Sequence, residues 1–452
     1  MCGIAGFVGE KARQRTCQMI EALKHRGPDG LAVQELGDAC LGHAHLKVTG
    51  DFPQPVTAGN VTFVYNGEIY NHSDFLPGST SDTEVLASIL KDGIAGFESA
   101  APKIDGEYAF AARDGSHITL VRDPLGIKPL YYGCSEAGFG FASERKALMR
   151  VGIRDIRSLS PGCMLAEGRE RRFADLPPMQ PALADEQEAV RRLDEALSRA
   201  VRLRLHKDAA VTFSGGIDSA LIGAMAPDTP LLTVGLPGSF DVKAAIHAAR
   251  AIGAEHRHTV YEVTEKDVEE ALPGVIYAIE SASPVSVSIA LPLYILSARA
   301  REDGYKVLLS GQGSDELFAG YARYEAGYVE SRLQEMLDHD QRHLAEVNLE
   351  RDDAAAMASG VELRVPYLDL AVVSLARQLD PSLKLRVNGK DYIRKYVLRK
   401  VAENYFPPDV SGAPKKAIQY GTGIQKTLER LARSHGCDLA GYLQTLYKVV
   451  LV

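Results

Sequence analysis

The sequence contains no CxxC pair and no long uninterrupted run of apolar residues. Its 6 cysteines are scattered and have no histidine-rich partner segment, which argues against a disulfide framework and against a zinc site. Without an apolar run of about 20 residues, we expect no transmembrane helix. The first residues, MCGIAGFVGE, lack a basic region ahead of an apolar core, so we expect no signal peptide and a cytoplasmic location.

Charge of one sign is not concentrated anywhere either. The formal net charge is -8 with no long acidic or basic run, which disfavours nucleic acid or a membrane surface as the main partner. A length of 452 residues exceeds what one hydrophobic core usually serves, so we expect two domains. The predicted limits are residues 1–165 and 187–452, joined by a polar, proline-containing linker over 166–186.

The second residue of the chain is a cysteine, Cys2. A small residue at this position permits removal of Met1, which would leave a free α-amino group on the same residue as the thiol. That amine has a reference pKa of about 7.7–8.0 and can act as a general base near neutral pH. Cys2 is therefore a candidate nucleophile for acyl transfer, although its position alone is equally compatible with chance.

Two further segments carry polar groups at the ends of apolar elements. A predicted strand over 61–65 ends at Asn66-Gly67-Glu68, where an amide side chain and a backbone N–H are suitable oxyanion donors. Asp82 precedes a predicted helix over 84–90, where a carboxylate either caps the helix or binds an ammonium group. Alternation of apolar and polar residues with Gly and Pro breaks predicts a β-rich layered domain.

Taken together, MCGIAGF, HRGPDG, NGEIYNH, SDTEV, RDPLGIKPLYY and FASERKAL resemble the class II glutamine amidotransferase domain over residues 1 to about 150. The resemblance implies an N-terminal-nucleophile αββα fold, of α+β class. It also implies that Cys2 attacks the side-chain amide of glutamine and that Asn66 and Gly67 form the oxyanion hole. Asp82 and Glu68 are then expected at the α-amino end of glutamine. The family's clamping Arg is replaced by His45, which is only partly charged near pH 7.

In the second half, a predicted buried strand over 209–213 enters Ser214-Gly215-Gly216-Ile217-Asp218-Ser219, and a helix begins at once. A strand, a glycine-rich loop and a helix in this order point free N–H groups at an anion. The loop lacks the GKS or GKT of the Walker form. It resembles the PP-loop of ATP pyrophosphatases, an α/β parallel-sheet fold, which implies cleavage of ATP to AMP and pyrophosphate.

Another predicted strand, over 306–309, ends in Ser310-Gly311-Gln312-Gly313-Ser314-Asp315. Asp218 and Asp315 both follow glycine-rich strand ends, where ligands of parallel sheets bind, and together they suit Mg²⁺ shared with phosphate oxygens. The alternative is that both carboxylates only cap helices. The resemblance implies that ATP is bound by Thr212, Ser214, Gly215, Gly216, Asp218, Ser219, Val234, Ser310 and Gly311.

With these motifs, residues 187 to 452 resemble the asparagine synthetase domain, which implies that Lys415 steadies charge on pyrophosphate or the tetrahedral intermediate. The acceptor segments differ from the family pattern. Gln312 stands where a Glu is usual, Ser288 aligns with an Arg, and Ala354 replaces the Arg that commonly follows Asp353. With Glu362, residues Gln312 and Ser288 form the predicted acceptor pocket, which has lost a carboxylate clamp.

Three functions remain open at this point. The first is a glutamine-dependent asparagine synthetase, a ligase using ATP and Mg²⁺ with glutamine and aspartate as small-molecule partners. The second is a related amide synthetase for another carboxylate. The third is a regulatory nucleotide-binding paralog, whose expected signature, loss of Cys2 or Asp218, is not present. We expect no nucleic-acid or membrane partner, and a homodimer is the candidate assembly.

Overall fold

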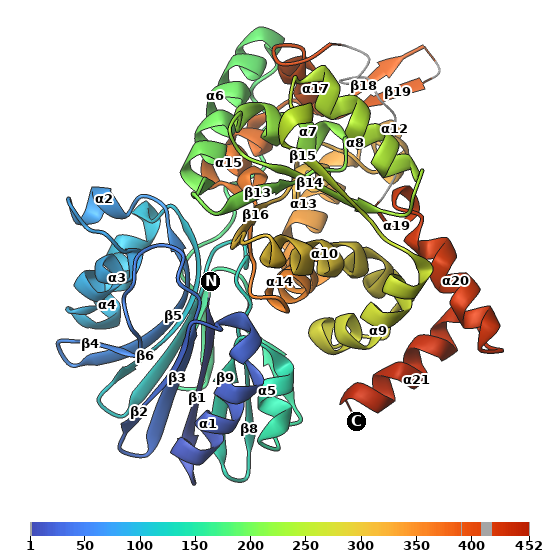
Figure 1. Ribbon diagram of the computed structural model, residues 1–452. Coiled ribbons are helices and arrows are strands. Elements are labelled where there is room, and N and C mark those ends of the chain that lie inside the picture. The colour runs from blue at the N-terminus through green and yellow to red at the C-terminus, as the bar shows by residue number, and fades with distance from the viewer. Residues whose placement is uncertain (1, 390, 408–417, 452) are drawn as a thin grey trace. The chain divides into compact units, whose positions relative to one another are not determined.

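The computed structural model describes residues 2–389, 391–407 and 418–451 (Figure 1). The chain forms two compact units. The first unit comprises Met1–Asp175 and Asn348–Glu362, and the second comprises Leu176–Val347 and Leu363–Val452. The expected linker over 166–186 contains a β-strand, Arg169–Arg172, and the chain returns to the first unit for one short segment in its second half.

The first unit is built on two antiparallel six-stranded sheets. The first sheet has the order β10-β8-β9-β1-β3-β2 and the second has the order β12-β11-β7-β6-β5-β4. The strands of the first sheet are β1 (Gly3–Gly9), β2 (Gly30–Leu36), β3 (Ala39–His45), β8 (Tyr131–Ser135), β9 (Gly138–Ala142) and β10 (Ile156–Ser158). Those of the second are β4 (Val56–Ala58), β5 (Val61–Ile69), β6 (Gly106–Asp114), β7 (His117–Arg122), β11 (Cys163–Ala166) and β12 (Arg169–Arg172).

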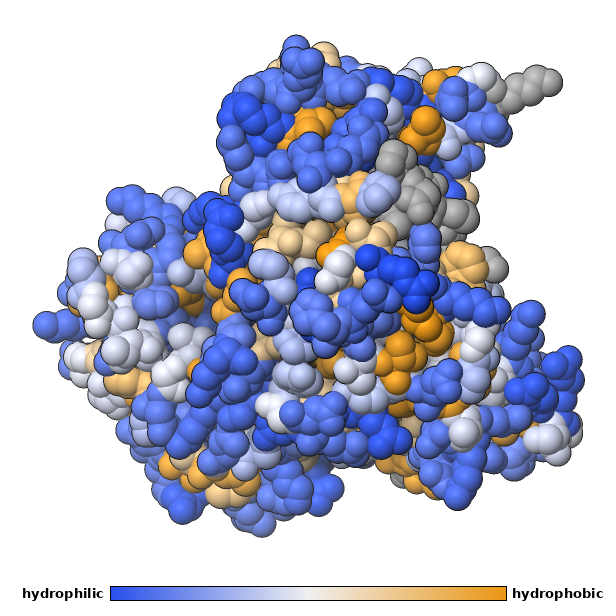
Figure 2. Space-filling model, turned by 45° about the horizontal axis from the view of Figure 1, so that its top comes forward, coloured by the Kyte–Doolittle hydropathy of each residue, from blue (hydrophilic) through white to orange (hydrophobic). Residues whose placement is uncertain are grey.

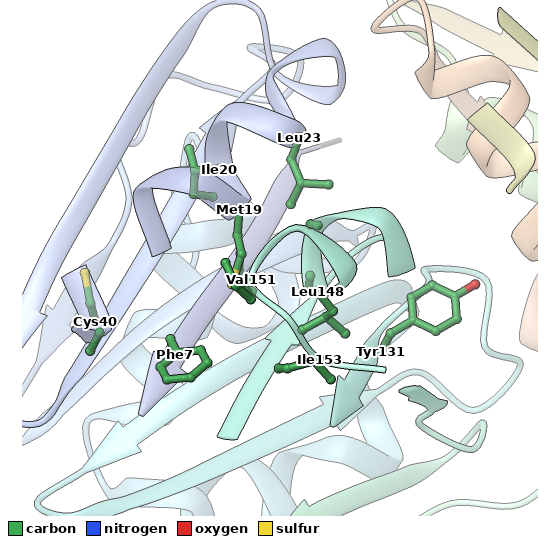
Figure 3. Close-up of a cluster of buried hydrophobic side chains, with 13 residues drawn as sticks. Phe7, Met19, Ile20, Leu23, Cys40, Tyr131, Leu148, Val151 and Ile153 are labelled. Atoms are coloured by element: carbon green, nitrogen blue, oxygen red, sulfur yellow. The ribbon is translucent and has the colours of Figure 1, made fainter. Parts of the chain in front are cut away.

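Helices cover the outer faces of both sheets. The helical elements of this unit are α1 (Ala12–Ala22), η1 (Lys24–Arg26), α2 (His72–Phe75), α3 (Asp82–Leu90), α4 (Gly93–Ala100), η2 (Ala101–Lys103), α5 (Arg145–Arg150) and α14 (Glu350–Met357). Phe7, Met19 and Leu148 belong to the core between α1, α5 and the first sheet (Figure 3). A second core lies between the sheets and a third under α3 and α4. The predicted αββα fold is confirmed.

The central strands of the two stacked sheets are covered on both faces, so their sequences are continuous runs of small and apolar residues. All nine residues of β5 are buried. Gly6 on β1 has no room for a side chain, because a Cβ atom there would lie 2.4 Å from Cε1 of Phe141. The close approach of β1 to its neighbours is what places the residue before it, Cys2, beside other strands.

The second unit contains a five-stranded sheet of order β15-β14-β13-β16-β17, in which β13 pairs in parallel with β14 and β16, and β14 with β15. Helices α7 and α8 lie over one face and α10 over the other (Figure 1). The predicted parallel-sheet fold is therefore confirmed. Its strands are β13 (Ala209–Thr212), β14 (Leu231–Gly235), β15 (His258–Glu262), β16 (Val307–Leu309) and β17 (Glu362–Arg364), where the chain enters this unit again.

The remaining described elements complete the second unit. They are α6 (Glu186–Arg204), α7 (Ile217–Met225), α8 (Phe240–Ala251), η3 (Glu255–Arg257), α9 (Glu265–Ile279), α10 (Pro284–Glu302), α11 (Ser314–Leu317), α12 (Arg323–Val329), α13 (Leu333–Arg342), η4 (Ala345–Leu349), η5 (Pro366–Leu368), α15 (Leu370–Gln378), α16 (Pro381–Lys384), β18 (Leu385–Asn388), β19 (Asp391–Arg394), α17 (Tyr396–Ala402), α19 (Ile418–Gly421), α20 (Ile424–Ser434) and α21 (Leu439–Leu451). The π-helix η4 carries the chain toward the first unit.

Most of the surface in view is hydrophilic, with apolar residues gathered in small separate patches (Figure 2). Scattered apolar patches of this kind are usual for globular proteins. Among the described residues, no single helix has the length and apolarity needed to cross a membrane. Helices α9 and α10 have this length and apolarity only when they are taken as one pair, and that pair is bent by 109°.

Candidate active sites

Cys2 lies immediately before β1 and is buried, with 8% of its surface exposed. Its backbone N–H donates a hydrogen bond of 2.8 Å to Oδ1 of Asn66 on β5, so the first and second sheets meet at this residue. Its thiol lies 4.0 Å from the carbonyl oxygen of Leu46, to which it donates. Burial raises the pKa of the Cys2 thiol above its ordinary value. At neutral pH the thiol is therefore protonated and needs a base to become a nucleophile.

Asn66 and Gly67 lie within β5, which continues to Ile69 instead of ending at residue 65 as expected. The continuation follows from pairing with β6, where Gly67 faces Tyr108. Oδ1 of Asn66 is used by Cys2, whereas its buried Nδ2 has no hydrogen-bond partner among the described residues. An unpaired buried donor is costly unless a ligand takes it, and this one suits an oxyanion. Gly67 admits no side chain, because a Cβ atom would lie 2.3 Å from the Glu107 carbonyl oxygen.

Asp82 is the first residue of α3, and the helix cap is Ser81, whose hydroxyl accepts from the Thr83 N–H. The reading of Asp82 as the N-cap is therefore wrong, because the residue before it takes that place. Oδ2 of Asp82 accepts from the Tyr65 hydroxyl at 2.9 Å and from the Ile69 N–H at 3.3 Å. Burial raises the pKa of Asp82. Glu68, also buried, accepts from the Thr49 hydroxyl at 3.0 Å.

His45, at the end of β3, is partly buried, and its ring centroid lies 5.3 Å from that of His43. Burial lowers the pKa of His45, so its imidazole is neutral at pH 7. Burial also lowers the pKa of His43 to about 3. The neighbouring Lys47 is paired with Asp51, with 2.7 Å between its Nζ and Oδ2 of the carboxylate. At neutral pH neither His43 nor His45 thus offers a charged imidazole to take over the role of the family's Arg.

In the second unit, β13 leads into a glycine-containing loop and then into α7, in the predicted order. The helix begins at Ile217, earlier than expected, so Asp218 and Ser219 lie in its first turn. Gly215 has φ +74°, and a Cβ atom there would lie 2.3 Å from backbone of Ala244, so only glycine fits. The hydroxyls of Ser214 and Ser219 lie 3.3 Å apart. The N-cap of α7, Gly216, provides no capping side chain, which leaves the first N–H groups of the helix for an anion.

The loop over 310–313 follows β16, the parallel neighbour of β13, and leads into α11, which contains Asp315. Because β13 and β16 are parallel, the loops that follow them begin at the same edge of the sheet. Oδ1 of Asp218 accepts from the Ser314 hydroxyl at 2.7 Å. A Cβ atom on Gly311 would lie 2.8 Å from Cβ of Asp218, which requires a residue without a side chain. Tyr367, buried beneath the first loop, donates its hydroxyl to the carbonyl oxygen of Asp218 at 3.1 Å.

Lys395 joins the two predicted metal-binding carboxylates. Its Nζ lies 2.6 Å from Oδ1 of Asp218 and 2.8 Å from Oδ1 of Asp315, and it donates to the Ser314 hydroxyl at 3.1 Å. Sequence reasoning missed this residue, because it lies in no glycine-rich motif. It precedes α17 in a left-handed conformation, φ +56°, which no local signal in the sequence predicts.

The carboxylate pair fits a magnesium ion in kind and position. No group of three or more His, Cys, Asp or Glu side chains able to hold a metal occurs in the described part of the chain. A metal at Asp218 and Asp315 would therefore take its other ligands from phosphate and water oxygens, as Mg²⁺ commonly does.

The other predicted residues of the second half are placed as follows. Thr212 ends β13 and donates to the Leu309 carbonyl at 3.1 Å, and Val234 is buried on β14. Ser288 on α10 is buried, with its hydroxyl bonded to the Val285 carbonyl at 3.0 Å. Gln312 donates its backbone N–H to the Ser310 hydroxyl at 3.3 Å.

The acceptor pocket remains a prediction. Glu362, fully buried, belongs to the first unit, whereas Gln312 and Ser288 belong to the second. Lys415 lies outside the described residues.

Comparisons with known proteins match both halves of the chain. The asparagine synthase family matches residues 192–343 and 327–447, and the glutamine amidotransferase domain family matches residues 1–162. The chain is 30% identical to asparagine synthetase B (glutamine-hydrolyzing) of Escherichia coli strain K12, over 97% of this chain and 86% of that protein. It is also 30% identical to asparagine synthetase (glutamine-hydrolyzing) 2 of Arabidopsis thaliana, over 94% of this chain and 79% of that protein.

Among solved structures, a glutamine phosphoribosylpyrophosphate amidotransferase from B. subtilis aligns with 88% of this chain and 100% of its own at 16% identity, with a TM-score of 0.35. That score is too low to add to the argument. The family matches and the relatives together confirm the resemblance that the motifs indicated. The chain belongs to the asparagine synthase family, as a glutamine-hydrolysing, ATP-dependent ligase.

Proposed function

We propose that this chain is an asparagine synthetase, which releases ammonia from glutamine at Cys2 and transfers it to an aspartyl adenylate made from ATP and aspartate. The observation that carries the proposal is the position of Cys2. It stands at the start of a strand, its N–H is bonded to Asn66, and the free Nδ2 of Asn66 is ready for an oxyanion. The cytoplasm and a homodimer are proposed as the setting.

In the glutaminase reaction, the thiol of Cys2 must first lose its proton, because burial raises its pKa. The α-amino group that Met1 removal exposes on the same residue is the proposed base. The thiolate then attacks the side-chain amide of glutamine, and Asn66 donates to the oxyanion. Collapse of this intermediate expels ammonia, which takes its proton from the protonated amine, and leaves a thioester that water hydrolyses to glutamate and the free thiol. Asp82 is proposed to bind the substrate's ammonium group, and His45 takes the position near its carboxylate.

In the synthetase reaction, the phosphates of ATP are proposed to lie on the N–H groups that begin α7. Asp218 and Asp315 would hold Mg²⁺, which neutralises phosphate charge when bound. Lys395 lies between the same carboxylates and supplies a fixed positive charge there. Lys415 keeps the role that the resemblance implies.

The test separates the two reactions. Cys2→Ala should abolish glutamine-dependent asparagine formation and leave synthesis from added ammonia. Asp218→Ala should remove magnesium-dependent pyrophosphate release, since metal and phosphates lose a shared anchor. The expected products are AMP, pyrophosphate and asparagine. Glutamine-dependent product from Cys2→Ala, or ADP and phosphate from the wild type, would refute the proposal.

A second candidate is an amide synthetase for a different carboxylate. Two residues favour it: Gln312 cannot form the ion pair with an ammonium group that a Glu would form, and Ser288 cannot balance the charge of an α-carboxylate as an Arg would. Pyrophosphate release with ATP and ammonia, measured across a panel of carboxylates, decides between the two candidates. Release that depends on an acid other than aspartate would favour the second.

A further inference from the structure

The segment Asn348–Glu362 lies within the part of the chain that matches the asparagine synthase family, yet it belongs to the first unit with the glutaminase residues. We propose that Asp353 of this segment is a positioning residue of the glutaminase: it holds Arg26, and Arg26 holds the backbone of Cys2. The proposal rests on the proposed function of Cys2 as the nucleophile.

Arg26 is the connecting group. Its side chain is fully buried on η1, and its Nε donates to the carbonyl oxygen of Cys2 at 3.1 Å. Its Nη1 donates to Oδ2 of Asp353 at 2.8 Å and to Oε1 of Glu144 at 2.9 Å. One guanidinium therefore joins the nucleophile's own backbone to carboxylates on α14 and at the start of α5.

Glu144 cannot serve Arg26 alone. Its other oxygen lies 2.7 Å from Nζ of Lys146 and 3.0 Å from Nε2 of His25. A buried carboxylate shared among several basic groups leaves positive charge uncompensated, and Asp353 supplies the second anion. Burial alone would lower the pKa of Arg26, but the two carboxylates raise it. The guanidinium stays charged, and its direction toward the Cys2 carbonyl is set from both sides.

Helix α14 holds Asp353 firmly in place. At its start, Glu350 pairs with Arg122 at 3.1 Å and accepts from the hydroxyls of Tyr131 and Ser158, both at 2.6 Å. At its end, Met357 packs against Leu46, whose carbonyl receives the Cys2 thiol. The segment thus contacts the surroundings of Cys2 at more than one point, so Asp353 is a fixed support.

The expected effect falls on the rate of glutamine hydrolysis. Asp353→Asn keeps the side-chain shape and removes the charge that orients Arg26. Small displacements of a reacting group reduce rates by about 10- to 100-fold, so we expect kcat for glutamine to fall by at least about tenfold. KM for glutamine should change less than about threefold, because Arg26 contacts the nucleophile's backbone. Synthesis from ammonia should be retained.

A matched control is the adjacent Asp352, whose Oδ1 accepts from Nε of Arg351 at 2.8 Å on the same helix. Asp352→Asn makes the same chemical change without touching Arg26, and should behave as wild type. Arg26→Lys and the double variant Arg26→Lys, Asp353→Asn complete a cycle. If Asp353 acts through Arg26, the double variant should be no slower than Arg26→Lys, whereas independent structural damage would add to the loss.

A second measurement does not depend on hydrolysis. The rate at which iodoacetamide alkylates Cys2, followed by peptide mass spectrometry, should rise at least threefold in Asp353→Asn and Arg26→Lys, because the buried thiol is held less tightly. It should not change in Asp352→Asn. An unchanged alkylation rate in Asp353→Asn overturns the proposal about Asp353, whether or not the wild type hydrolyses glutamine. A wild type that hydrolyses no glutamine would instead count against the proposed function. Additive losses in the cycle overturn it as well.

Discussion

The ammonium group of Lys395 lies 2.6 Å from Oδ1 of Asp218, where Mg²⁺ is proposed to bind. The same group lies 2.8 Å from Oδ1 of Asp315, so one cation is shared by both carboxylates. Two carboxylates this close to one point, Asp218 buried and Asp315 partly buried, repel each other unless a positive charge lies between them. A magnesium ion at the same oxygens would direct the ammonium group toward phosphate oxygens instead.

Lys395→Met should destabilise the protein, because both carboxylates lose their shared cation. Removing one partner of a buried ion pair typically costs about 3–5 kcal/mol. Millimolar Mg²⁺ should restore part of that loss, since it binds the same oxygens. The measurement is the melting temperature with and without Mg²⁺. Lys400→Met is the control, because Lys400 lies on α17, which follows Lys395, and pairs at the surface with Glu403. Equal Mg²⁺ effects on both variants would contradict the prediction.

His45→Arg should lower KM for glutamine. Because burial lowers the pKa of His45, the imidazole is neutral above pH 7 and gains charge only as the pH falls. Wild-type KM should therefore decrease from pH 8 to pH 6, whereas the variant should show no such trend. A hydrogen bond to a charged group contributes about 1.5–3 kcal/mol, or roughly a 10- to 100-fold change in KM. Steady-state glutaminase kinetics at several pH values test this, and a KM that is independent of pH in the wild type would contradict it.

The features that could be predicted from the sequence are those formed by residues that are neighbours in the chain. The loop over 214–219 is recognisable because a strand, glycines and a helix follow one another within one short segment. The strands around Cys2 and Asn66 were also predictable from their composition, although β5 runs further than expected because its later residues pair with β6.

What could not be predicted are the contacts between distant positions. Asp353 reaches Arg26 across 327 residues of sequence, and Lys395 reaches Asp218 across 177. No periodicity or motif encodes such pairs, since they depend on how packed elements bring buried charges together. The same holds for the return of the chain to the first unit at residue 348.

Lys384 provides a pH-dependent test of stability. It is buried on α16, its Nζ has no hydrogen-bond partner among the described residues, and burial lowers its pKa to about 7. In the unfolded chain its pKa is about 10.4, so between these values the unfolded state binds more protons and stability rises with pH.

Lys384→Met should raise the melting temperature most below pH 7, by several degrees, because the buried charge no longer has to be accommodated. The gain should shrink between pH 7 and pH 10, because the folded lysine is already neutral there and removing the proton from the unfolded lysine costs less as the pH approaches about 10.4. Differential scanning calorimetry of both proteins across this range makes the comparison. A gain that stays constant with pH would show that the lysine does not titrate in this window.

Gln312→Glu tests the acceptor. Gln312 follows Ser310 and Gly311 in the loop that presents Asp315, and its amide can form hydrogen bonds but cannot balance charge. If the natural acceptor is aspartate, restoring the carboxylate should increase kcat/KM for aspartate by about tenfold or more, the value of one charged hydrogen bond. Ser288→Arg is less suitable as a first variant, because Ser288 is buried with 1% exposure on α10. If the natural acceptor is another acid, Gln312→Glu should impair turnover of that acid and leave aspartate a poor substrate.

The deciding measurement is kcat/KM for aspartate and for the best carboxylate of the panel, in the wild type and in Gln312→Glu, with ammonia as nitrogen donor. A wild type that already uses aspartate efficiently, with no change on substitution, would show that Gln312 does not govern the choice of acceptor.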